Sequence, residues 1–317
     1  MSSVASAESV PIEMIHVNCP LCGQNNTRIL YKPWNTTIDP RTVLSASGGV
    51  RGTQYIVKCT NCSLIYVDPR PQPEVVVDSY ASSVDEVYVG AATTRESTFR
   101  RCVGIVNAVA PRGKLLDVGC AAGFFVKAAR DAGWDAIGVE PSRWLADYGL
   151  TQLGVRILPG TLAEAKFPDE SFDVVTMWDV LEHVPDPLTE VREVFRILRP
   201  GGLLVVNYPD IGTWIARLAG RQWWFLLSVH LTYFTQNTLK AMLSRVGFTA
   251  LSFRPHYQVL NLGHLIKMGG LYVPVVSKVF GRTIGALRLD SIPIPYYASQ
   301  TNAMARKPSI GSEPQPR

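Results

Sequence analysis

The sequence lacks the long apolar segments that membrane insertion and secretion require. No stretch of about 18 residues is apolar throughout, so a transmembrane helix is not expected. Residues 1–14 contain no basic start followed by an apolar run, which argues against a secretory signal. We therefore expect a cytoplasmic chain whose six cysteines stay reduced.

The chain also lacks a strong charge of either sign and any internal repeat. Its 31 basic and 26 acidic side chains give a net charge of +5 and are spread along the sequence. Such a weak positive charge does not favour binding to the phosphates of a nucleic acid. A length of 317 residues allows one large domain with a smaller appended module. No pattern indicates the oligomeric state.

Composition and turn residues divide the chain into a small module and a large domain. Residues 1–14 and 307–317 are small and polar and are expected to form flexible tails. Cysteine pairs and short strand-like runs occupy residues 15–73, and a proline-rich end closes this module. The large domain is expected to cover residues 74–306, beginning with helical segments.

From Lys114 onward, apolar strand-like runs alternate with helical segments. One helix is expected over 121–132, where Gly133 follows as a C-terminal glycine. Asp186 and Pro187 form an N-cap and first-turn pair for another helix. The alternation predicts an α/β fold with a doubly wound, Rossmann-like parallel sheet covered on both faces. The expected strands are 115–118, 136–139, 172–176 and 203–206.

A glycine turn joins the first of these strands to the helix that follows. Gly119 and Gly123 allow a tight loop at the carboxyl end of the strand, where ligands of such sheets lie. A dinucleotide fingerprint needs a small residue at the position of Phe124, so an NAD site is disfavoured. The loop can instead wrap a methionine chain, whose carboxylate is attracted to helix N-terminal amides. Glu140, which ends the second strand, is placed to accept hydrogen bonds from ribose hydroxyls.

Five motifs in this order resemble the class I SAM-dependent methyltransferases, and most closely their ubiquinone-type and secondary-metabolite group. The motifs lie at 115–123, 138–142, 167–173, 178–184 and 198–202. The resemblance implies a seven-stranded sheet whose last strand, at 302–306, is antiparallel. It also implies a set of residues that bind S-adenosyl-L-methionine (SAM). These residues are Asp117, Gly119, Cys120, Ala121, Gly123, Glu140, Pro141, Leu162, Trp178 and Asp179.

The sequence departs from this family pattern at two positions. Ala121 stands where the family often has glycine, a small change that the loop should tolerate. Thr161 stands where an aspartate commonly contacts adenine, so we expect the backbone near Leu162 to make that contact instead.

Two Cys-x-x-Cys pairs precede the large domain. Cys19 and Cys22 form the first pair, and Cys59 and Cys62 form the second. Four thiolates in two such pairs suit a closed tetrahedral Zn²⁺ site, which predicts a small zinc-ribbon-like module with structural zinc. The alternatives are a disulfide framework, which a cytoplasmic location disfavours, and a redox pair. Two further cysteines, Cys102 and Cys120, are expected to be buried as small apolar residues.

The region after the fifth strand is expected to face the methyl acceptor. If the acceptor is a hydroxyl, its proton must leave, and histidine is the side chain best matched to that task near neutral pH. His230 is therefore the preferred general base, and His183 is expected to assist it or to organise the pocket. Residues 259–289 form an apolar and basic insertion, expected to act as a lid over the acceptor. Peripheral contact of residues 260–289 with a membrane is an alternative role.

The resemblance leaves several acceptors open. The leading hypothesis is O-methylation of a small-molecule or sugar hydroxyl. One alternative is C-methylation of a nucleotide sugar. Another is methylation of RNA gripped by the zinc module, although the Asn/Asp-Pro-Pro-aromatic segment of many enzymes that methylate base amino groups is absent. A non-catalytic SAM-binding protein is a further alternative, which the glycine loop and Glu140 disfavour.

Overall fold

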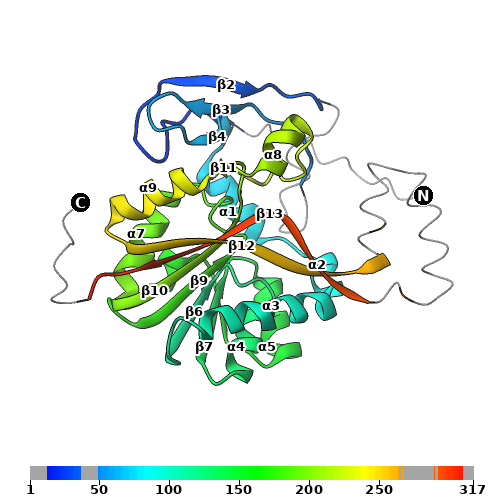
Figure 1. Cartoon of the computed structure of the whole chain (residues 1–317), viewed down its shortest axis with the longest axis vertical. Helices are drawn as coiled ribbons and strands as arrows, with labels where there is room; N and C mark the ends of the chain where they lie inside the picture. Colours follow the sequence, from blue (N-terminus) through cyan, green and yellow to red (C-terminus); the bar gives the residue numbers. More distant parts are fainter. Residues whose placement is uncertain (1–12, 37–48, 264–265, 267–288, 290–291, 310–317) are drawn as a thin grey trace, which may run out of the picture.

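The computed structural model describes residues 13–36, 49–263, 266, 289 and 292–309 (Figure 1). The strands are β1 (Met14–Ile15), β2 (Thr27–Tyr31), β3 (Ile56–Cys59), β4 (Ile65–Val67), β5 (Arg70–Pro71), β6 (Lys114–Val118), β7 (Asp135–Glu140), β8 (Ile157–Pro159), β9 (Phe172–Trp178), β10 (Leu198–Pro209), β11 (Thr232–Tyr233), β12 (Thr249–Asn261) and β13 (Pro293–Arg306). The helices are α1 (Pro73–Ala81), α2 (Glu86–Gly90), α3 (Ala92–Asn107), α4 (Phe124–Asp131), α5 (Arg143–Leu153), α6 (Leu162–Ala165), α7 (Pro187–Ile197), α8 (Trp214–Ala219), the 3-10 turn η2 (Gly220–Gln222) and α9 (Gln236–Val246).

The large domain is built on one seven-stranded sheet. Its strand order is β12-β13-β10-β9-β6-β7-β8, and the strands from β10 to β8 run parallel. Strand β13 lies antiparallel between β10 and β12. Helices α3, α4 and α5 cover one face, and α6, α7 and α9 cover the other (Figure 1). The predicted α/β fold and its antiparallel last strand are confirmed, and β13 begins well before the expected 302–306.

Local signals explain where the helices begin and end. The Asp186 side chain accepts a hydrogen bond from the backbone N–H of Thr189, 3.1 Å away, so α7 begins at Pro187 as expected. Helix α4 begins at Phe124 and not at residue 121, because the chain before it is still in the glycine turn. Gly133 follows α4 with a φ of +89°, the left-handed conformation of a helix-ending glycine.

The N-terminal module shares its sheet with the large domain. Strands β2, β3 and β4 form an antiparallel sheet whose fourth strand, β11, comes from the loop that follows β10 (Figure 1). The backbone N–H of Val67 also donates to the carbonyl of Leu231, 2.9 Å away. Cys19 and Cys59 are buried in the same apolar cluster as Leu116 of β6. The module therefore packs directly onto the core of the methyltransferase-like sheet.

The boundaries expected for the tails differ slightly from the structure. Met14 belongs to β1, which pairs with β5 near the end of the module. Lys307 exchanges backbone hydrogen bonds with Gly201 and Gly202 and so continues the edge of the sheet. Most of the insertion, residues 264–265 and 267–288, lies outside the described residues. Among the helices that the structure describes, none is long and apolar enough to cross a membrane.

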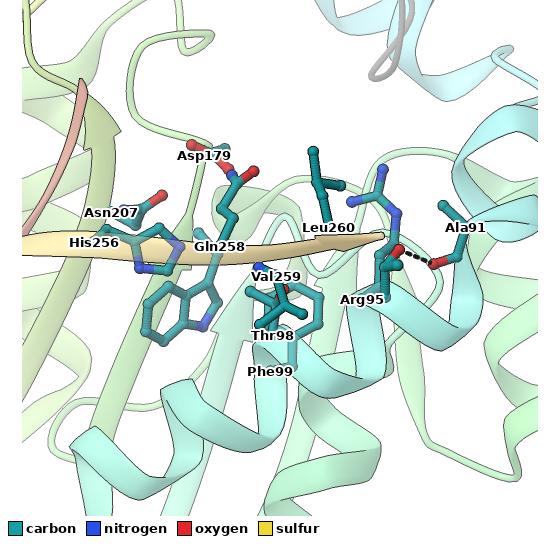
Figure 2. Close-up of a pocket in the computed structure, with 12 residues that line it drawn as sticks. Ala91, Arg95, Thr98, Phe99, Asp179, Asn207, His256, Gln258, Val259 and Leu260 are labelled. Carbon is teal, nitrogen blue, oxygen red and sulfur yellow. Dashed lines mark hydrogen bonds between the residues drawn. The ribbon is translucent and has the colours of Figure 1, made fainter. Parts of the chain in front are cut away.

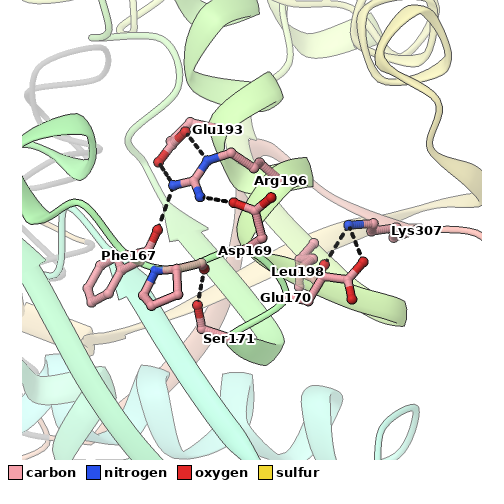
Figure 3. Close-up of polar contacts among 9 residues, drawn as sticks. Phe167, Asp169, Glu170, Ser171, Glu193, Arg196, Leu198 and Lys307 are labelled. Carbon is pink, nitrogen blue, oxygen red and sulfur yellow. Dashed lines mark hydrogen bonds and ion pairs between the residues drawn. The ribbon is translucent and has the colours of Figure 1, made fainter.

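One of the five motifs, at 167–173, lies at the amino ends of β9 and β10, where its contacts are structural. Arg196 of α7 contacts the carboxylates of Asp169 and Glu193, and Lys307 approaches Glu170 at 3.6 Å (Figure 3). The Arg196 side chain also donates to the carbonyl of Phe167 at 2.7 Å. These contacts join the loop before β9 to α7. They lie at the amino ends of the strands, whereas the glycine turn lies at the carboxyl end of β6.

Candidate functional site

The glycine turn after β6 is packed too tightly for larger residues. Gly119 has a φ of +62°, and a Cβ atom there would lie 2.7 Å from a methyl carbon of Val180. Gly123 has a φ of +82°, and a Cβ atom there would lie 2.8 Å from Val155. Between them Ala121 holds a φ of +47°, a conformation that costs a non-glycine residue about 1–2 kcal/mol. The turn therefore brings its backbone close to the loop that follows β9.

Glu140 at the carboxyl end of β7 lies directly against this turn. Its carboxylate accepts hydrogen bonds from the backbone N–H groups of Ala121, at 2.8 Å, and Ser142, at 2.9 Å. Burial raises the pKa of Glu140 to about 7, although these two amides oppose the shift. Each carboxylate oxygen keeps acceptor capacity beyond the one amide that it binds. Glu140 is thus oriented by the same loop that would hold a ligand.

The other residues expected around the ligand lie beneath or beside the turn. Asp117 is buried, and its carboxylate accepts a hydrogen bond from the Thr176 hydroxyl at 2.6 Å. Burial raises the pKa of Asp117 to about 8. Cys120 is also buried, as is Cys102 in α3, which agrees with the apolar role expected for both cysteines. Pro141 follows Glu140 directly and leads into α5.

In the segment after β8, the Glu164 carboxylate is used to cap helix α6. Thr161 caps helix α6: its hydroxyl accepts from the N–H of Glu164, and the Glu164 carboxylate accepts from the N–H of Thr161. Leu162, the first residue of α6, is buried in the core. The expected contact of an adenine base with the backbone near Leu162 therefore stays a prediction.

A cavity of about 130 Å³ opens at the carboxyl ends of β9 and β10 (Figure 2). Trp178 and Asp179 line it together with side chains from α3 and β12. The indole N–H of Trp178 is buried without a hydrogen-bond partner. Asp179 is reached by solvent and accepts a hydrogen bond from Gln300, while the surrounding protein raises its pKa to about 6. The remaining lining residues are Ala91, Thr94, Arg95, Thr98, Phe99, Asn207, His256, Gln258, Val259 and Leu260.

His183 and His230 lie against each other although they are far apart in the sequence. Their ring centroids are 4.7 Å apart in an edge-to-face arrangement. The Nδ1 atom of His183 lies 2.9 Å from the carbonyl oxygen of Val229, and that of His230 lies 2.8 Å from the carbonyl oxygen of Phe225. A carbonyl oxygen only accepts hydrogen bonds, so contact with Phe225 requires a proton on Nδ1 of His230 and leaves a lone pair on its Nε2 atom. Nδ1 of His183 is contacted both by the Val229 carbonyl and by the Tyr80 hydroxyl.

The surroundings keep both imidazoles neutral. Burial lowers the pKa of His183 to about 4 and that of His230 well below its usual range. Glu182 joins the pair, because a carboxylate oxygen and one ring nitrogen of each histidine lie within 4.8 Å of one another. The Tyr80 hydroxyl lies 2.8 Å from Nδ1 of His183. Burial raises the pKa of Tyr80, and the negative charges of Glu182 and Glu140 add to this shift.

The four cysteines of the N-terminal module converge as their spacing predicts. The Sγ atoms of Cys19 and Cys62 are 3.4 Å apart, and those of Cys22 and Cys59 are 3.6 Å apart. All four sulfur atoms lie within 4.8 Å of one another. Sulfur atoms around a tetrahedral Zn²⁺ ion, each about 2.3 Å from the metal, would be separated by about 3.8 Å. The cluster therefore has the size and donor set of a structural metal site.

Several residues of the site could not be predicted from the sequence. Glu182 lies within one of the five motifs but received no role, although its neighbour His183 did. Arg95, whose guanidinium carbon lies 3.5 Å from the ring centroid of Tyr88, and Tyr80 come from helical segments without a distinctive pattern. His256 lies on β12, and its ring centroid is 6.1 Å from that of Trp178. For Glu182 alone the sequence offered a signal, namely its place beside a histidine after a strand.

Comparison with protein families gives a match over half of the chain. Residues 94–252 match the family model described as "Methyltransferase domain". The match begins in α3 and ends in β12, and it includes the glycine turn, Glu140 and both histidines of the cluster.

Similar curated proteins match about a third of the chain. An uncharacterized methyltransferase from Mycobacterium sp. (strain KMS) is 37% identical over 114 residues, which is 35% of this chain and 44% of the relative. The ubiquinone biosynthesis O-methyltransferase of Methylococcus capsulatus is 40% identical over 97 residues, which is 28% of this chain and 40% of the relative. The chain thus covers less than half the length of these relatives.

Similar solved structures share the fold at low sequence identity. A SAM-dependent methyltransferase from Archaeoglobus fulgidus superposes with a TM-score of 0.50 and 16% identity, covering 70% of this chain and 100% of that one. A chain from the complex between the Haloferax volcanii Trm112 methyltransferase activator and a methyltransferase superposes with a TM-score of 0.51 and 14% identity. That match covers 72% of this chain and 98% of the other.

Proposed function

Because the chain belongs to the class I SAM-dependent methyltransferases, we propose that it transfers a methyl group to a hydroxyl of a small molecule or sugar. The observation that carries the proposal is the pair of neutral, buried imidazoles of His183 and His230, each with a lone pair on one ring nitrogen. Glu182 belongs to the same cluster as these two histidines. It lies in the same loop as Asp179, and Asp179 lines the cavity. A hydroxyl acceptor needs such a group, because its proton must leave when the oxygen is methylated.

The residues around the glycine turn fit SAM. Gly119 allows the turn to pack against Val180, where a Cβ atom would clash, and Glu140 presents a buried carboxylate for two ribose hydroxyls. Trp178 lines the cavity, and its buried indole N–H has no hydrogen-bond partner among the residues that the structure describes. Leu162 and Cys120 lie buried behind the glycine turn and support its backbone, which would face the methionine chain. When bound, SAM supplies an electrophilic methyl group.

The protein's own residues then have two tasks. Asp179 and the other cavity residues orient the acceptor, since methyl transfer requires the acceptor atom in line with the methyl carbon. His230, with His183 beside it, assists loss of the hydroxyl proton. Their buried surroundings exclude water that would compete with the acceptor.

The four-cysteine cluster completes the proposal as a structural zinc site. Cys19, Cys22, Cys59 and Cys62 would bind one Zn²⁺ ion with no position left open, which is typical of a structural site. The ion would lock β3 and β4, and through them β11, onto the large domain.

The acceptor class is tested by following the label from methyl-labelled SAM into fractions of a cell extract. We expect the label in a small-molecule or glycan product that keeps it under alkaline hydrolysis, as an ether does and an ester does not. Label in the RNA fraction, label on carbon, or donor binding without any transfer would each contradict O-methylation. The extract supplies the candidate acceptors, so the compound need not be identified before the assay.

Loss of the Glu140 carboxylate is expected to weaken SAM binding by about 1.5–3 kcal/mol, which is about 10- to 150-fold. The reason is the loss of charge-assisted hydrogen bonds to ribose. Calorimetry on Glu140→Ala measures the effect. Because alanine also frees the amides of Ala121 and Ser142, Glu140→Gln serves as a second variant of the same size. Asp131→Ala, at the exposed end of α4, is the control. Wild-type affinity in both Glu140 variants would remove this residue from the donor site.

A further inference from the structure

We infer that Glu182, His183 and His230 bind a divalent transition-metal ion whose free coordination positions take the acceptor oxygen. This second metal site is separate from the four cysteines. The role assigned to the ion rests on the proposed O-methylation, whereas binding of the ion does not.

The three side chains already lie at ligand spacing. One ligand atom from each residue lies within 4.8 Å of those of the other two. A short inward movement brings such a triangle to the distance of about 2.0–2.2 Å at which nitrogen and oxygen bind zinc-like ions. Among the residues that the structure describes, the cysteine cluster and this one are the groups of three or more metal-binding side chains.

The Glu182 carboxylate has no hydrogen-bond partner among the residues that the structure describes. Its side chain is 2% exposed, and neither oxygen makes a hydrogen bond. The neighbouring Asp179 carboxylate is also negative, so it further disfavours the charged form of Glu182. A bare buried carboxylate costs several kcal/mol unless a cation or a proton compensates it. A metal ion between Glu182 and the two imidazoles provides the missing positive charge.

The ring orientation of each histidine is fixed by the backbone. Nδ1 of His183 lies 2.9 Å from the carbonyl of Val229, and Nδ1 of His230 donates to the carbonyl of Phe225 at 2.8 Å. For His230 this leaves Nε2 as the ligand atom. Metal-binding histidines in proteins characteristically donate their second ring N–H to a backbone carbonyl in this way, which fixes the orientation of the ring.

The backbone locks the two segments of the site together. The carbonyl oxygen of Glu182 accepts hydrogen bonds from the N–H groups of Leu231, at 2.8 Å, and Thr232, at 3.1 Å. Thr232 begins β11, which pairs with β4 of the N-terminal module. The ligands are therefore held before any ion arrives, so little conformational entropy is lost on binding.

The donor set indicates the kind of ion. Two imidazoles and one carboxylate are typical of Zn²⁺, Fe²⁺ and related first-row ions, whereas Mg²⁺ and Ca²⁺ prefer oxygen ligands throughout. Three protein ligands leave at least one position open. An ion there would lower the pKa of a hydroxyl oxygen bound at the open position, and the two histidines would act on the acceptor by holding this ion.

The test uses the full-length protein, stripped of metal by a chelator and reloaded with Co²⁺ alone. We expect two Co²⁺ ions per chain by elemental analysis. One should show the thiolate charge-transfer absorption of the cysteine site, and the other should show only the weaker absorption of nitrogen and oxygen ligands. Glu182→Gln and His230→Gln should retain the cysteine-bound ion and bind the second at least roughly 100-fold more weakly.

Two controls separate this result from misfolding and from the proposed function. His256→Ala, a buried histidine outside the cluster, should keep both ions. SAM calorimetry on the Glu182 and His230 variants should give wild-type affinity, which shows that they are folded. One Co²⁺ per chain in the wild type, or equal affinity for the second ion in wild type and Glu182→Gln, would overturn the metal site. Metal binding without any O-methylated product would overturn the proposed function alone.

Discussion

Replacing His230 by alanine is expected to lower kcat by roughly 100-fold or more while the affinity for SAM stays unchanged. His230 is buried beside His183, and it lies in the cluster that is proposed to ionise the acceptor hydroxyl. The residues expected to bind the donor belong to the other side of the site, around the glycine turn and Glu140. The variant should therefore lose chemistry and keep donor binding. Steady-state kinetics with an identified acceptor, together with SAM calorimetry, measures both quantities.

Alanine variants of two other histidines test whether the loss of kcat is specific to this cluster. His183→Ala should act in the same sense as His230→Ala, because the two rings belong to one cluster. His16→Ala is the matched control, since His16 is exposed and contacts only Asp68 in the N-terminal module. If His230→Ala raises the KM for the acceptor and leaves kcat unchanged, His230 is a wall of the pocket and has no part in proton removal.

Replacing Cys59 by serine is expected to remove the zinc ion and to loosen the N-terminal module together with the β11 segment of the large domain. Structural zinc sites bind with about 10–16 kcal/mol of apparent free energy, which is comparable to the whole stability of a domain. Cys59 is fully buried and packs in the same cluster as Leu116 of β6. Its strand, β3, also pairs with β4, which in turn holds β11.

The consequence should reach the acceptor side of the site. Loosening of β11 at Thr232–Tyr233 frees the segment whose amides hold Glu182, so methyl transfer should fall together with thermal stability. The α/β core itself should stay folded. Metal analysis, thermal unfolding and amide hydrogen exchange at Thr232 and Tyr233 follow the effect. Cys102→Ser, which also places serine at a buried position but outside the cluster, measures the cost of the substitution alone. A metal-free wild-type protein that is fully folded would contradict the prediction.

The elements that the sequence predicted correctly depend on neighbours along the chain. Apolar runs such as that of β6 define strands, and a capping pair such as Asp186 and Pro187 defines the start of a helix. The glycine turn is equally local, because Gly119 and Gly123 are needed wherever the backbone must take a positive φ. The cysteine pairs also converged as expected, because a Cys-x-x-Cys turn places two thiols on one side of a single loop. In each case the physical cause lies within a few residues, so the pattern is readable without the fold.

Only the tertiary structure decided how the N-terminal module and the acceptor side are connected. Strand β11 is two residues long, which is too short to give a periodic signal, and it exists because the edge of β4 supplies its hydrogen-bond partners. Glu182 became part of the site for a similar reason. The loop after β9 and the loop before β11 meet when the module closes over the sheet, and this contact brings His230 to His183. Hydrogen bonds and burial between segments so distant in the chain depend on packing, and no local pattern of residues encodes them.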